Sequence, residues 1–202
     1  MIIIIDYGMG NLASVYNAFI KVNDKNEDIK ISSDEKLIRD ADKLILPGVG
    51  AFGDAMKNLE KFKLVYPILD HINKNKFFLG ICLGFQLLFK KSYENGVFDG
   101  LGIIKGEVVR FKTELPIPHM GWNTVKVIKR KGIFENINDN SFFYFDHSYY
   151  PILEDNETVA TLTNYNNEFV SGICYNNIYG VQFHPEKSHF NGLKIVKSFL
   201  NQ

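Results

Sequence analysis

Short apolar runs alternate with amphipathic stretches through the N-terminal half of the sequence. Residues 2–5 are four consecutive isoleucines, and such β-branched runs are typical of strands that are buried on both faces of a parallel sheet. Residues 11–22 follow as an expected helix, because Leu12, Val15 and Phe19 recur at helical spacing and form one apolar face. This alternation predicts parallel strands joined by crossover helices, which is an α/β fold.

The alternation continues to residue 81 and then changes period. We expect further strands at residues 28–32, 43–46 and 77–81, and helices at residues 55–62 and 65–74. Residues 102–129 and 142–183 carry β-branched and aromatic runs separated by Gly, Asn and Asp, which predicts a more antiparallel region. Residues 191–200 are expected to close the chain as a helix. The predicted architecture is one three-layer α/β domain over residues 1–202, with a mostly parallel central sheet and an antiparallel C-terminal extension.

Composition excludes several classes of function. The 202 residues are 46% hydrophobic, enough to bury a core. Lys plus Arg and Asp plus Glu both total 23, so no net field favours nucleic acid or an anionic membrane. The sequence has no secretory signal, no run of about 20 apolar residues and only two cysteines. We therefore expect a cytoplasmic protein that binds neither membranes nor nucleic acids.

A candidate nucleophile lies where the last expected parallel strand meets the next helix. The segment Gly80-Ile81-Cys82-Leu83-Gly84 has the G-x-nucleophile-x-G pattern of a tight strand-to-helix turn, and we expect a helix at residues 85–91. A helix N-terminus favours the thiolate of Cys82 over the thiol. Taken alone, the pattern fits equally a buried structural cysteine, with glycines that allow close helix packing.

The segment His184-Pro185-Glu186 supplies a candidate base and its orienting carboxylate. If the preceding strand continues through Pro185, His184 and Glu186 project to the same side, and the carboxylate accepts a hydrogen bond from the imidazole. His71 lies mid-helix without such a carboxylate, so we interpret it as structural. Cys174 lies within a strand pattern that no helix follows, so it is no rival nucleophile. A lone His-Pro-Glu would usually be a surface turn. Its combination with the cysteine turn indicates a nucleophile with its base.

Backbone N–H groups that could stabilise an oxyanion are expected beside the nucleophile. Gly48, Val49 and Gly50 follow the strand at residues 43–46, and Leu83 follows Cys82. The alternative is an ordinary strand-ending turn after Pro47. A phosphate site is not expected at these glycines, because no Lys-Ser/Thr pair follows them.

Together these segments resemble class I glutamine amidotransferases of the Cys-His-Glu triad type. Within that family, several flanking segments are similar to those of the glutaminase subunits of imidazole glycerol phosphate synthases. These segments follow the expected order along nearly the whole chain: Asp6 to Asn11, Leu46 to Phe52, Pro118 to Asn123, His147 to Tyr149 and Phe183 to Ser188.

The resemblance implies a flavodoxin-like fold, glutamine as substrate, neither cofactor nor metal, and a (β/α)8-barrel cyclase as partner in a heterodimer. By similarity, residues expected to contact glutamine are Gln86, Glu94, His147, Ser148 and Tyr149, and residues expected to face the barrel are Trp122, Tyr144 and Lys187. From the residues alone, Glu94 could instead be a solvated charge beside Lys90 and Lys91, and Trp122 could be a core residue.

One position departs from the family pattern, and three other functions stay open. Asp146 precedes His147, where family members usually carry an apolar residue. A paralogous subunit with another barrel partner would feed ammonia to a sugar amidotransferase that makes amidino sugars of surface glycans. A non-catalytic scaffold or regulatory subunit would not need Cys82, His184 and Glu186 together. A cysteine hydrolase acting on peptides or glyoxal-like substrates would need neither Gln86 nor a partner.

Overall fold

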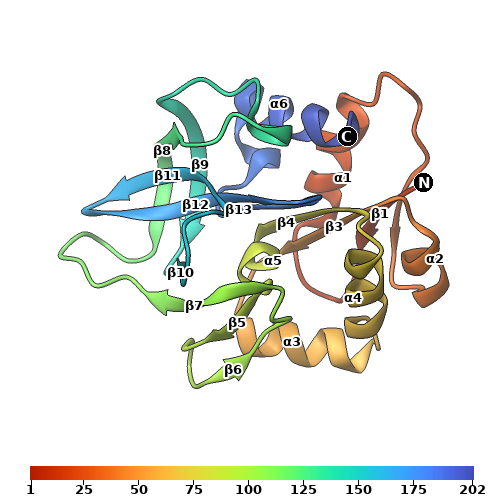
Figure 1. The fold of residues 1–202 in the computed structure, drawn as a ribbon, viewed down its shortest axis with the longest axis horizontal. Helices are drawn as coiled ribbons and strands as arrows, with labels where there is room; N and C mark the ends of the chain where they lie inside the picture. The colour runs from red at the N-terminus through yellow and green to blue at the C-terminus, as the bar shows by residue number, and fades with distance from the viewer.

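A nine-stranded sheet forms the centre of the structure, a computed structural model that describes residues 1–202 (Figure 1). In spatial order its strands are β2 (Ile29–Ser32), β1 (Ile2–Ile5), β3 (Lys43–Gly48), β4 (Phe77–Cys82), β13 (Ile178–Val181), β12 (Asn167–Tyr175), β11 (Val159–Tyr165), β8 (His119–Val127) and β9 (Ser141–His147). The first five are parallel to one another, and each later strand is antiparallel to its neighbour. The change from parallel to antiparallel pairing follows the change of period in the sequence.

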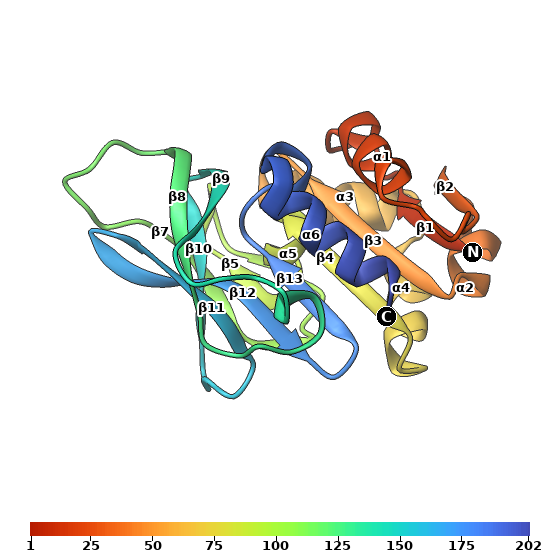
Figure 2. The ribbon, with the colours of Figure 1, turned by 90° about the horizontal axis from the view of Figure 1, so that it is seen from above.

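Helices cover both faces of the parallel half (Figure 2). One layer contains α1 (Leu12–Lys21) and α6 (His189–Leu200), and the other contains α2 (Glu35–Asp40), α3 (Phe52–Lys61) and α4 (Val65–Asn73). The four isoleucines of β1 alternate between two cores: Ile2 and Ile4 pack with α1 and α6, whereas Ile3 and Ile5 pack with α2, α3 and α4. This arrangement explains why the strand is apolar at every position.

A second sheet of four strands lies beside the first. It consists of β10 (Tyr149–Leu153), β7 (Ile104–Arg110), β5 (Phe89–Ser92) and β6 (Phe98–Asp99). The helix predicted at residues 85–91 was therefore wrong in length. The helix α5 (Leu83–Gln86) is a single turn, and the strand β5 follows it. Residues 87–89 are all buried, and Phe89 pairs in parallel with Ile104 of β7. Periodicity alone cannot distinguish a helix from a strand in such a short, fully buried apolar run, so the sequence did not show where the helix ends.

Local side chains account for several helix boundaries. The Asn11 carboxamide accepts a hydrogen bond from Ser14 N at 3.3 Å, so α1 begins at Leu12. Asp34 accepts one from Leu37 N at 2.9 Å and begins the six-residue helix α2, which the sequence pattern did not reveal. Two short 3₁₀ helices, η1 (Gly132–Phe134) and η2 (Pro185–Lys187), complete the structure.

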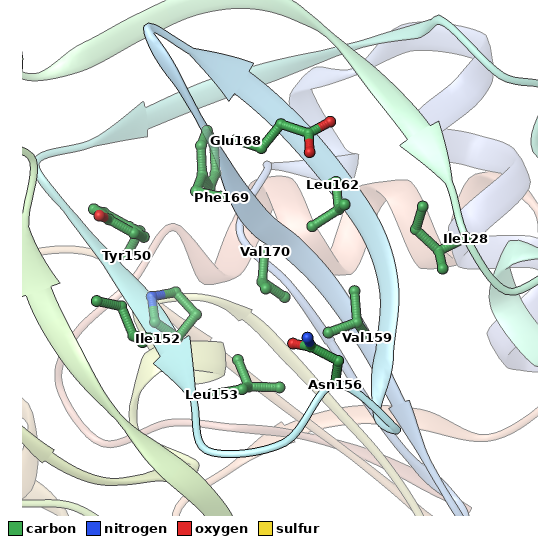
Figure 3. A pocket seen from close by; sticks show the side chains of 11 residues that line it. Ile128, Tyr150, Ile152, Leu153, Asn156, Val159, Leu162, Glu168, Phe169 and Val170 are labelled. Carbon is green, nitrogen blue, oxygen red and sulfur yellow. The ribbon is translucent and has the colours of Figure 1, made fainter.

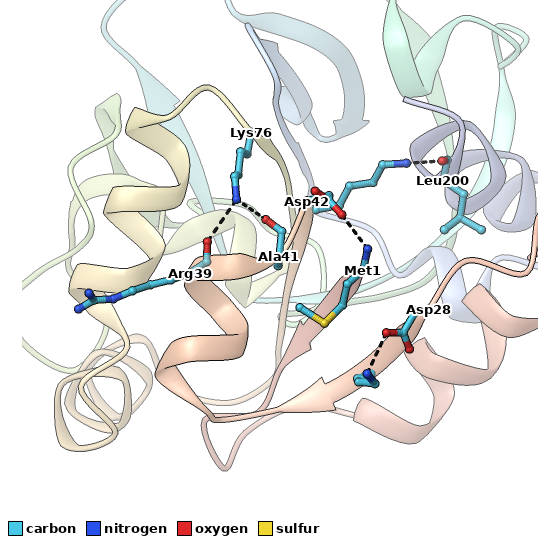
Figure 4. Close-up of polar contacts among 9 residues, drawn as sticks. Met1, Asp28, Arg39, Ala41, Asp42, Lys76 and Leu200 are labelled. Atoms are coloured by element: carbon cyan, nitrogen blue, oxygen red, sulfur yellow. Dashed lines mark hydrogen bonds and ion pairs between the residues drawn. The ribbon is translucent and has the colours of Figure 1, made fainter.

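Polar contacts fasten the amino ends of the parallel strands (Figure 4). The α-amino group of Met1 lies 2.7 Å from Asp42 Oδ2, and Lys76 Nζ donates to the carbonyl of Ala41 at 2.6 Å. The buried Lys43 donates to the carbonyl of Leu200 at the end of α6. These contacts lie opposite the carboxyl ends of β3 and β4, where Gly48 and Cys82 are found. None of the helices combines the length and the apolar character needed to cross a membrane.

Candidate active site

Cys82 ends β4 in a strained backbone conformation, with φ 54° and ψ −109°. A positive φ is rare outside glycine and is found where a nucleophile is held on a sharp strand-to-helix turn. The two flanking glycines are required by close backbone contacts. A Cβ on Gly84 would lie 1.7 Å from Leu46 O, and one on Gly80 would lie 2.7 Å from Gly84 O. Both glycines are therefore needed for the tight turn, as the sequence pattern predicted.

The environment of the Cys82 sulfur differs from the one we expected. Because α5 is a single turn, it cannot supply the macrodipole of a long helix. Cys82 is only 5% exposed. Its sulfur lies 3.7 Å from Gln182 Nε2 and 3.9 Å from the carbonyl oxygen of Asp146. Gln182 is a residue that sequence reasoning missed, although it stands two positions before His184.

His184 and Glu186 meet as predicted, but through a different backbone. The strand β13 ends at Val181, so the expected extended geometry through Pro185 was wrong, and η2 brings the side chains together instead. His184 Nδ1 lies 2.8 Å from Glu186 Oε1, and both side chains are 3% exposed. The other ring nitrogen, Nε2, is buried and makes no hydrogen bond within the chain.

Electrostatics favour a protonated His184 ring. Burial acts to lower its pKa, but the Cys82 charge and the Glu186 carboxylate outweigh burial and raise the pKa to about 10. An imidazolium between a sulfur nucleophile and a buried carboxylate is the arrangement that a Cys-His-Glu triad requires.

The expected oxyanion segment lies directly beside the nucleophile. Gly48 is the register partner of Cys82 in the parallel pair β3 and β4. A Cβ on Gly48 would lie 2.4 Å from the Tyr7 hydroxyl and 3.0 Å from Leu83 Cβ, so only glycine fits. The Tyr7 hydroxyl donates to the Pro47 carbonyl at 2.9 Å and anchors this segment. As the first residue of α5, Leu83 has no intrahelical acceptor for its N–H.

A cavity of about 150 Å³ opens beside Cys82. It is smaller than the usual pocket for a drug-sized ligand, and its size suits one small metabolite. Its lining residues come from several segments of the chain: Val49, Gly50, Cys82, Leu83, Gln86, Glu94, Asp146, His147, Ser148 and Tyr149. The structure therefore brings together all five residues expected to contact glutamine, while Gly48, His184 and Glu186 lie outside this lining.

Glu94 is anchored at the cavity and is not a free solvated charge. Its Oε2 accepts a hydrogen bond from Phe52 N at 2.7 Å, at the first residue of α3. Burial raises the pKa of the carboxyl, and the hydrogen bond from Phe52 opposes that rise. The neighbouring lysines pair elsewhere, Lys90 with Glu154 and Lys91 with Glu107. The other carboxylate oxygen of Glu94 is left for a cationic group in the cavity.

Gln86 has both of its amide hydrogens engaged inside the protein. Its Nε2 donates to the Tyr149 carbonyl at 2.9 Å and to Gln182 Oε1 at 3.0 Å. Only the Gln86 carbonyl oxygen is therefore free to meet a ligand.

The three residues expected at a partner interface lie together with a histidine at the surface, where Tyr144 is half-buried. Trp122 is 46% exposed and stacks on His189 at 5.1 Å, so it is not a core residue. Tyr144 packs edge-on to Trp122, and Lys187 Nζ lies 5.3 Å from the Tyr144 ring. We call Trp122, Tyr144, Lys187 and His189 the aromatic face. It adjoins the triad, because the Tyr144 carbonyl accepts a hydrogen bond from His184 N.

Other candidates take no part in this site. His71 is fully buried and bonds the Phe77 carbonyl through Nε2 at 3.0 Å, which agrees with its structural interpretation. Cys174 is buried within β12. A larger apolar groove of about 540 Å³ lies among β10, β11 and β12, lined by residues such as Ile152, Leu162 and Val170 (Figure 3). None of the triad residues lines it.

Residues 3–202 match the glutamine amidotransferase class-I family, and the chain belongs to that family. The chain is 51% identical over 197 residues to the imidazole glycerol phosphate synthase subunit HisH of Aquifex aeolicus, covering 98% of this chain and 94% of that protein. It is 47% identical over 205 residues to the subunit HisH 2 of Methanococcus maripaludis, with both chains fully covered.

Solved structures support the fold. PurLQS from Thermotoga maritima superposes with a TM-score of 0.75 at 20% identity, covering 99% of this chain and 97% of that chain. The glutaminase domain of CTPS from Trypanosoma brucei gives a TM-score of 0.70 at 14% identity, covering 100% of this chain and 94% of that chain. The flavodoxin-like α/β fold expected from the resemblance is therefore confirmed.

Proposed function

We propose that this chain is the glutaminase subunit of an imidazole glycerol phosphate synthase, with residues 1–202 acting as one amidotransferase domain. It hydrolyses glutamine to glutamate and passes ammonia to a (β/α)8-barrel cyclase, which makes imidazole glycerol phosphate and AICAR. The observation that carries this proposal is the His184–Glu186 pair beside Cys82, at a cavity sized for one amino acid. The full-length identity to HisH subunits supports the particular acceptor. The expected location is the cytoplasm.

The acylation step uses Cys82, His184 and the two backbone segments beside them. The Cys82 sulfur attacks the side-chain carbonyl of glutamine, and the resulting oxyanion accepts hydrogen bonds from N–H groups near Val49 and Leu83. The proton held by His184 passes to the departing nitrogen, so the C–N bond breaks and ammonia leaves. Glu186 keeps the imidazole oriented through both stages. A γ-glutamyl thioester on Cys82 remains.

Deacylation restores the free Cys82 thiolate, and the ammonia already released must be kept from protonation by solvent. His184 takes a proton from water, the hydroxide attacks the thioester, and glutamate is released as the sulfur leaves. Free ammonia would be mostly protonated at neutral pH and would lose its nucleophilicity. A partner docked on the aromatic face would shield its exit, since that face adjoins the triad through Tyr144 and His184.

Glutamine is placed by the remaining cavity residues. The free oxygen of Glu94 suits the α-ammonium group of the substrate, and the Gln86 carbonyl oxygen offers a second acceptor. Backbone groups of Ser148 and Tyr149 close the opposite wall. These assignments predict selectivity for a free amino acid over an amide within a peptide.

Asp146, where relatives of this family usually carry an apolar residue, leaves one alternative acceptor open. In the β8–β9 ladder Asp146 lies opposite Met120, close along the ladder to the Trp122–Tyr144 pair of the aromatic face. A carboxylate at this place suits a partner that offers a matching cation. A paralogous subunit with such a barrel partner would share the glutaminase chemistry and deliver ammonia to a sugar.

Glutamate release from glutamine distinguishes these functions. The purified chain is assayed alone, with the cyclase subunit, and with the cyclase and its imidazole-precursor ribonucleotide. Strong stimulation by the last combination is expected. Hydrolysis that this cyclase cannot stimulate would favour the sugar acceptor, and no hydrolysis in any combination would contradict the enzyme and favour a scaffold.

A further inference from the structure

Two buried histidines take no part in the proton transfers described above: His147, which lines the cavity, and His119, which lies outside its lining. His119 of β8 and His147 of β9 are register partners across the antiparallel pair, and they are 4% and 6% exposed. Nδ1 of His119 lies 3.0 Å from Nε2 of His147. Two imidazoles that bond directly to each other can do so only if one donates and the other accepts.

A carbonyl at one end fixes the direction of every bond in this pair. His147 Nδ1 lies 2.8 Å from the Tyr149 carbonyl, which can only accept, so the proton of His147 is on Nδ1. Its Nε2 is then an acceptor, and His119 Nδ1 must donate to it. His119 Nε2 in turn accepts from the Asn123 amide at 3.1 Å. Burial keeps both rings neutral, because it lowers the pKa of His119 to about 4 and that of His147 to about 3.

Aromatic packing holds the two rings in these orientations. His119 is stacked between Phe145, at 4.8 Å, and Tyr165, at 4.1 Å. The His147 ring packs against Phe111 and Phe169, each at 5.2 Å. Neither ring can turn without opening this cluster, so the hydrogen bonds have one geometry.

The carbonyl that ends the chain of bonds also belongs to the glutamine site. The Tyr149 oxygen accepts from both His147 and Gln86, and Gln86 donates further to Gln182, whose amide nitrogen lies 3.7 Å from the Cys82 sulfur. The connected bonds thus run from Asn123, next to Trp122 of the aromatic face, to the nucleophile.

We propose that His119 and His147 are positioning residues, which fix the Tyr149 carbonyl and, through it, the Gln86 side chain that lines the glutamine cavity. This inference rests on the proposed glutaminase function for its kinetic consequence. Its structural content, the tautomer of each ring, is independent of that function.

The tautomers are measured first, on the unmodified chain. Long-range ¹H–¹⁵N NMR spectra of ¹⁵N-histidine-labelled protein are expected to show both rings neutral at pH 7, each with its proton on Nδ1. A proton on Nε2 of His147, or a charged ring in either residue, would overturn the proposal. Loss of activity in any variant does not affect this result.

Two substitutions then separate positioning from packing. His119→Phe keeps an aromatic ring but removes both nitrogens, whereas His119→Asn keeps an amide N–H near the position of Nδ1. In the complex with the cyclase, the Phe variant is expected to raise KM for glutamine about tenfold, the size expected for one buried hydrogen bond, with little change in kcat. The Asn variant is expected to restore most of the loss.

His71→Phe is the matched control, because His71 is an equally buried neutral histidine with one backbone bond on the far side of the sheet. It should lower thermal stability without changing KM. Equal KM values for the Phe and Asn variants at position 119, or a wild-type KM in the Phe variant, would overturn the proposal. If the wild-type complex hydrolyses no glutamine, the proposed function fails and the NMR result alone decides the inference.

Discussion

Cys82 has a backbone conformation that is costly for a non-glycine residue, and its neighbours maintain it. A strained φ of this kind costs about 1–3 kcal/mol and persists only where the surroundings determine it. Here the surroundings are Gly80 and Gly84, which let two backbones approach, and Gln182, which contacts the sulfur. His184 is similarly constrained by the buried Glu186 carboxylate.

Glu186→Gln is expected to remove most of the activity while preserving the fold. The amide keeps the size of the side chain but no longer carries the charge that stabilises an imidazolium, so the pKa of His184 falls below about 10 although Cys82 still raises it. Loss of the corresponding carboxylate in other triads costs up to about 10⁴-fold in kcat, and we expect a loss of about 10²- to 10⁴-fold. Steady-state glutaminase kinetics with the cyclase measure it, and thermal unfolding provides the check on folding. Wild-type kcat in this variant would contradict the role of Glu186.

At the scale of secondary structure, the active site depends on the close packing of α5 against β3 and β4. The short helix begins beside Leu46 and Gly48 with no space between the backbones. Strand β3 leads into the proposed oxyanion segment, β4 ends at the proposed nucleophile, and β13 leads into His184. All three therefore deliver their groups at the same carboxyl edge of the sheet, as is usual for α/β folds.

Gly84→Ala is expected to destabilise the protein by more than about 3 kcal/mol, because its Cβ would overlap the Leu46 carbonyl at 1.7 Å and force β3 and α5 apart. Gly102→Ala is the control: nothing lies within 4 Å of its added Cβ, and its φ of 66° costs about 1 kcal/mol. Urea unfolding of both variants measures the difference. Equal losses in the two variants would contradict the close approach of the backbones at Gly84.

Much of the parallel half of the fold could be predicted from sequence because β1 and β4 contain no charged residue and are apolar almost throughout. Residues 2–5 and 77–81 needed no tertiary information. The second sheet could not be predicted, since β5 is only four residues long and its pairing with β7 is fixed by tertiary contacts. The same is true of the helix wrongly extended to residue 91.

The tight turn at Cys82 and the contact between His184 and Glu186 could also be predicted from the sequence, because each lies in a short recognisable pattern. Contacts between distant segments could not. Gln182 meets Gln86, and His119 meets His147, only after the strands have paired. Sequence spacing alone holds no signal for either pair.

Across the whole molecule, two hydrophobic cores support the carboxyl edge of the sheet and the aromatic face. The aromatic face lies at the antiparallel end of the large sheet, away from α2 and α4 (Figure 1). Trp122 is half-exposed there and contacts chiefly Tyr144 and His189, so its removal should affect binding more than folding.

Trp122→Ala is expected to weaken binding of the cyclase subunit at least about tenfold, because exposed tryptophans at interfaces are frequent hot spots. Tyr66→Ala on α4, where the side chain is 64% exposed, is the control and should leave the affinity unchanged. Isothermal titration calorimetry measures both. Equal affinities for wild type and the Trp122 variant would place the interface elsewhere.

Stability is expected to fall in mild acid. Burial lowers the pKa of His71 to about 4 and that of His147 to about 3, from 6.5, and His119 acts in the same direction. Below about pH 6.5 the unfolded chain therefore binds protons at these histidines, whereas the folded chain keeps them neutral. The stability that these groups contribute is present above pH 6.5 and is lost as the pH falls toward 4. For His71 and His147 together the slope reaches about 3 kcal/mol per pH unit at most.

His184 has the opposite sign, because its folded pKa is raised. The stability that it contributes is present below pH 6.5 and lost as the pH rises toward 10. Calorimetric Tm values between pH 4 and 10 measure both limbs. The variant His71→Phe should show a shallower acid limb, and an unchanged Tm between pH 6.5 and 4.5 in the wild type would contradict the neutral buried histidines.

Acid quenching tests whether Cys82 forms the covalent γ-glutamyl thioester on which the proposed chemistry depends. The chain is mixed with glutamine in the presence of the cyclase and its ribonucleotide, quenched, digested and analysed by mass spectrometry. We predict a γ-glutamyl adduct on the peptide that contains Cys82, present also in Cys174→Ala and absent in Cys82→Ala. Continued glutamate release by the Cys82→Ala variant, or an adduct on another residue, would contradict the account.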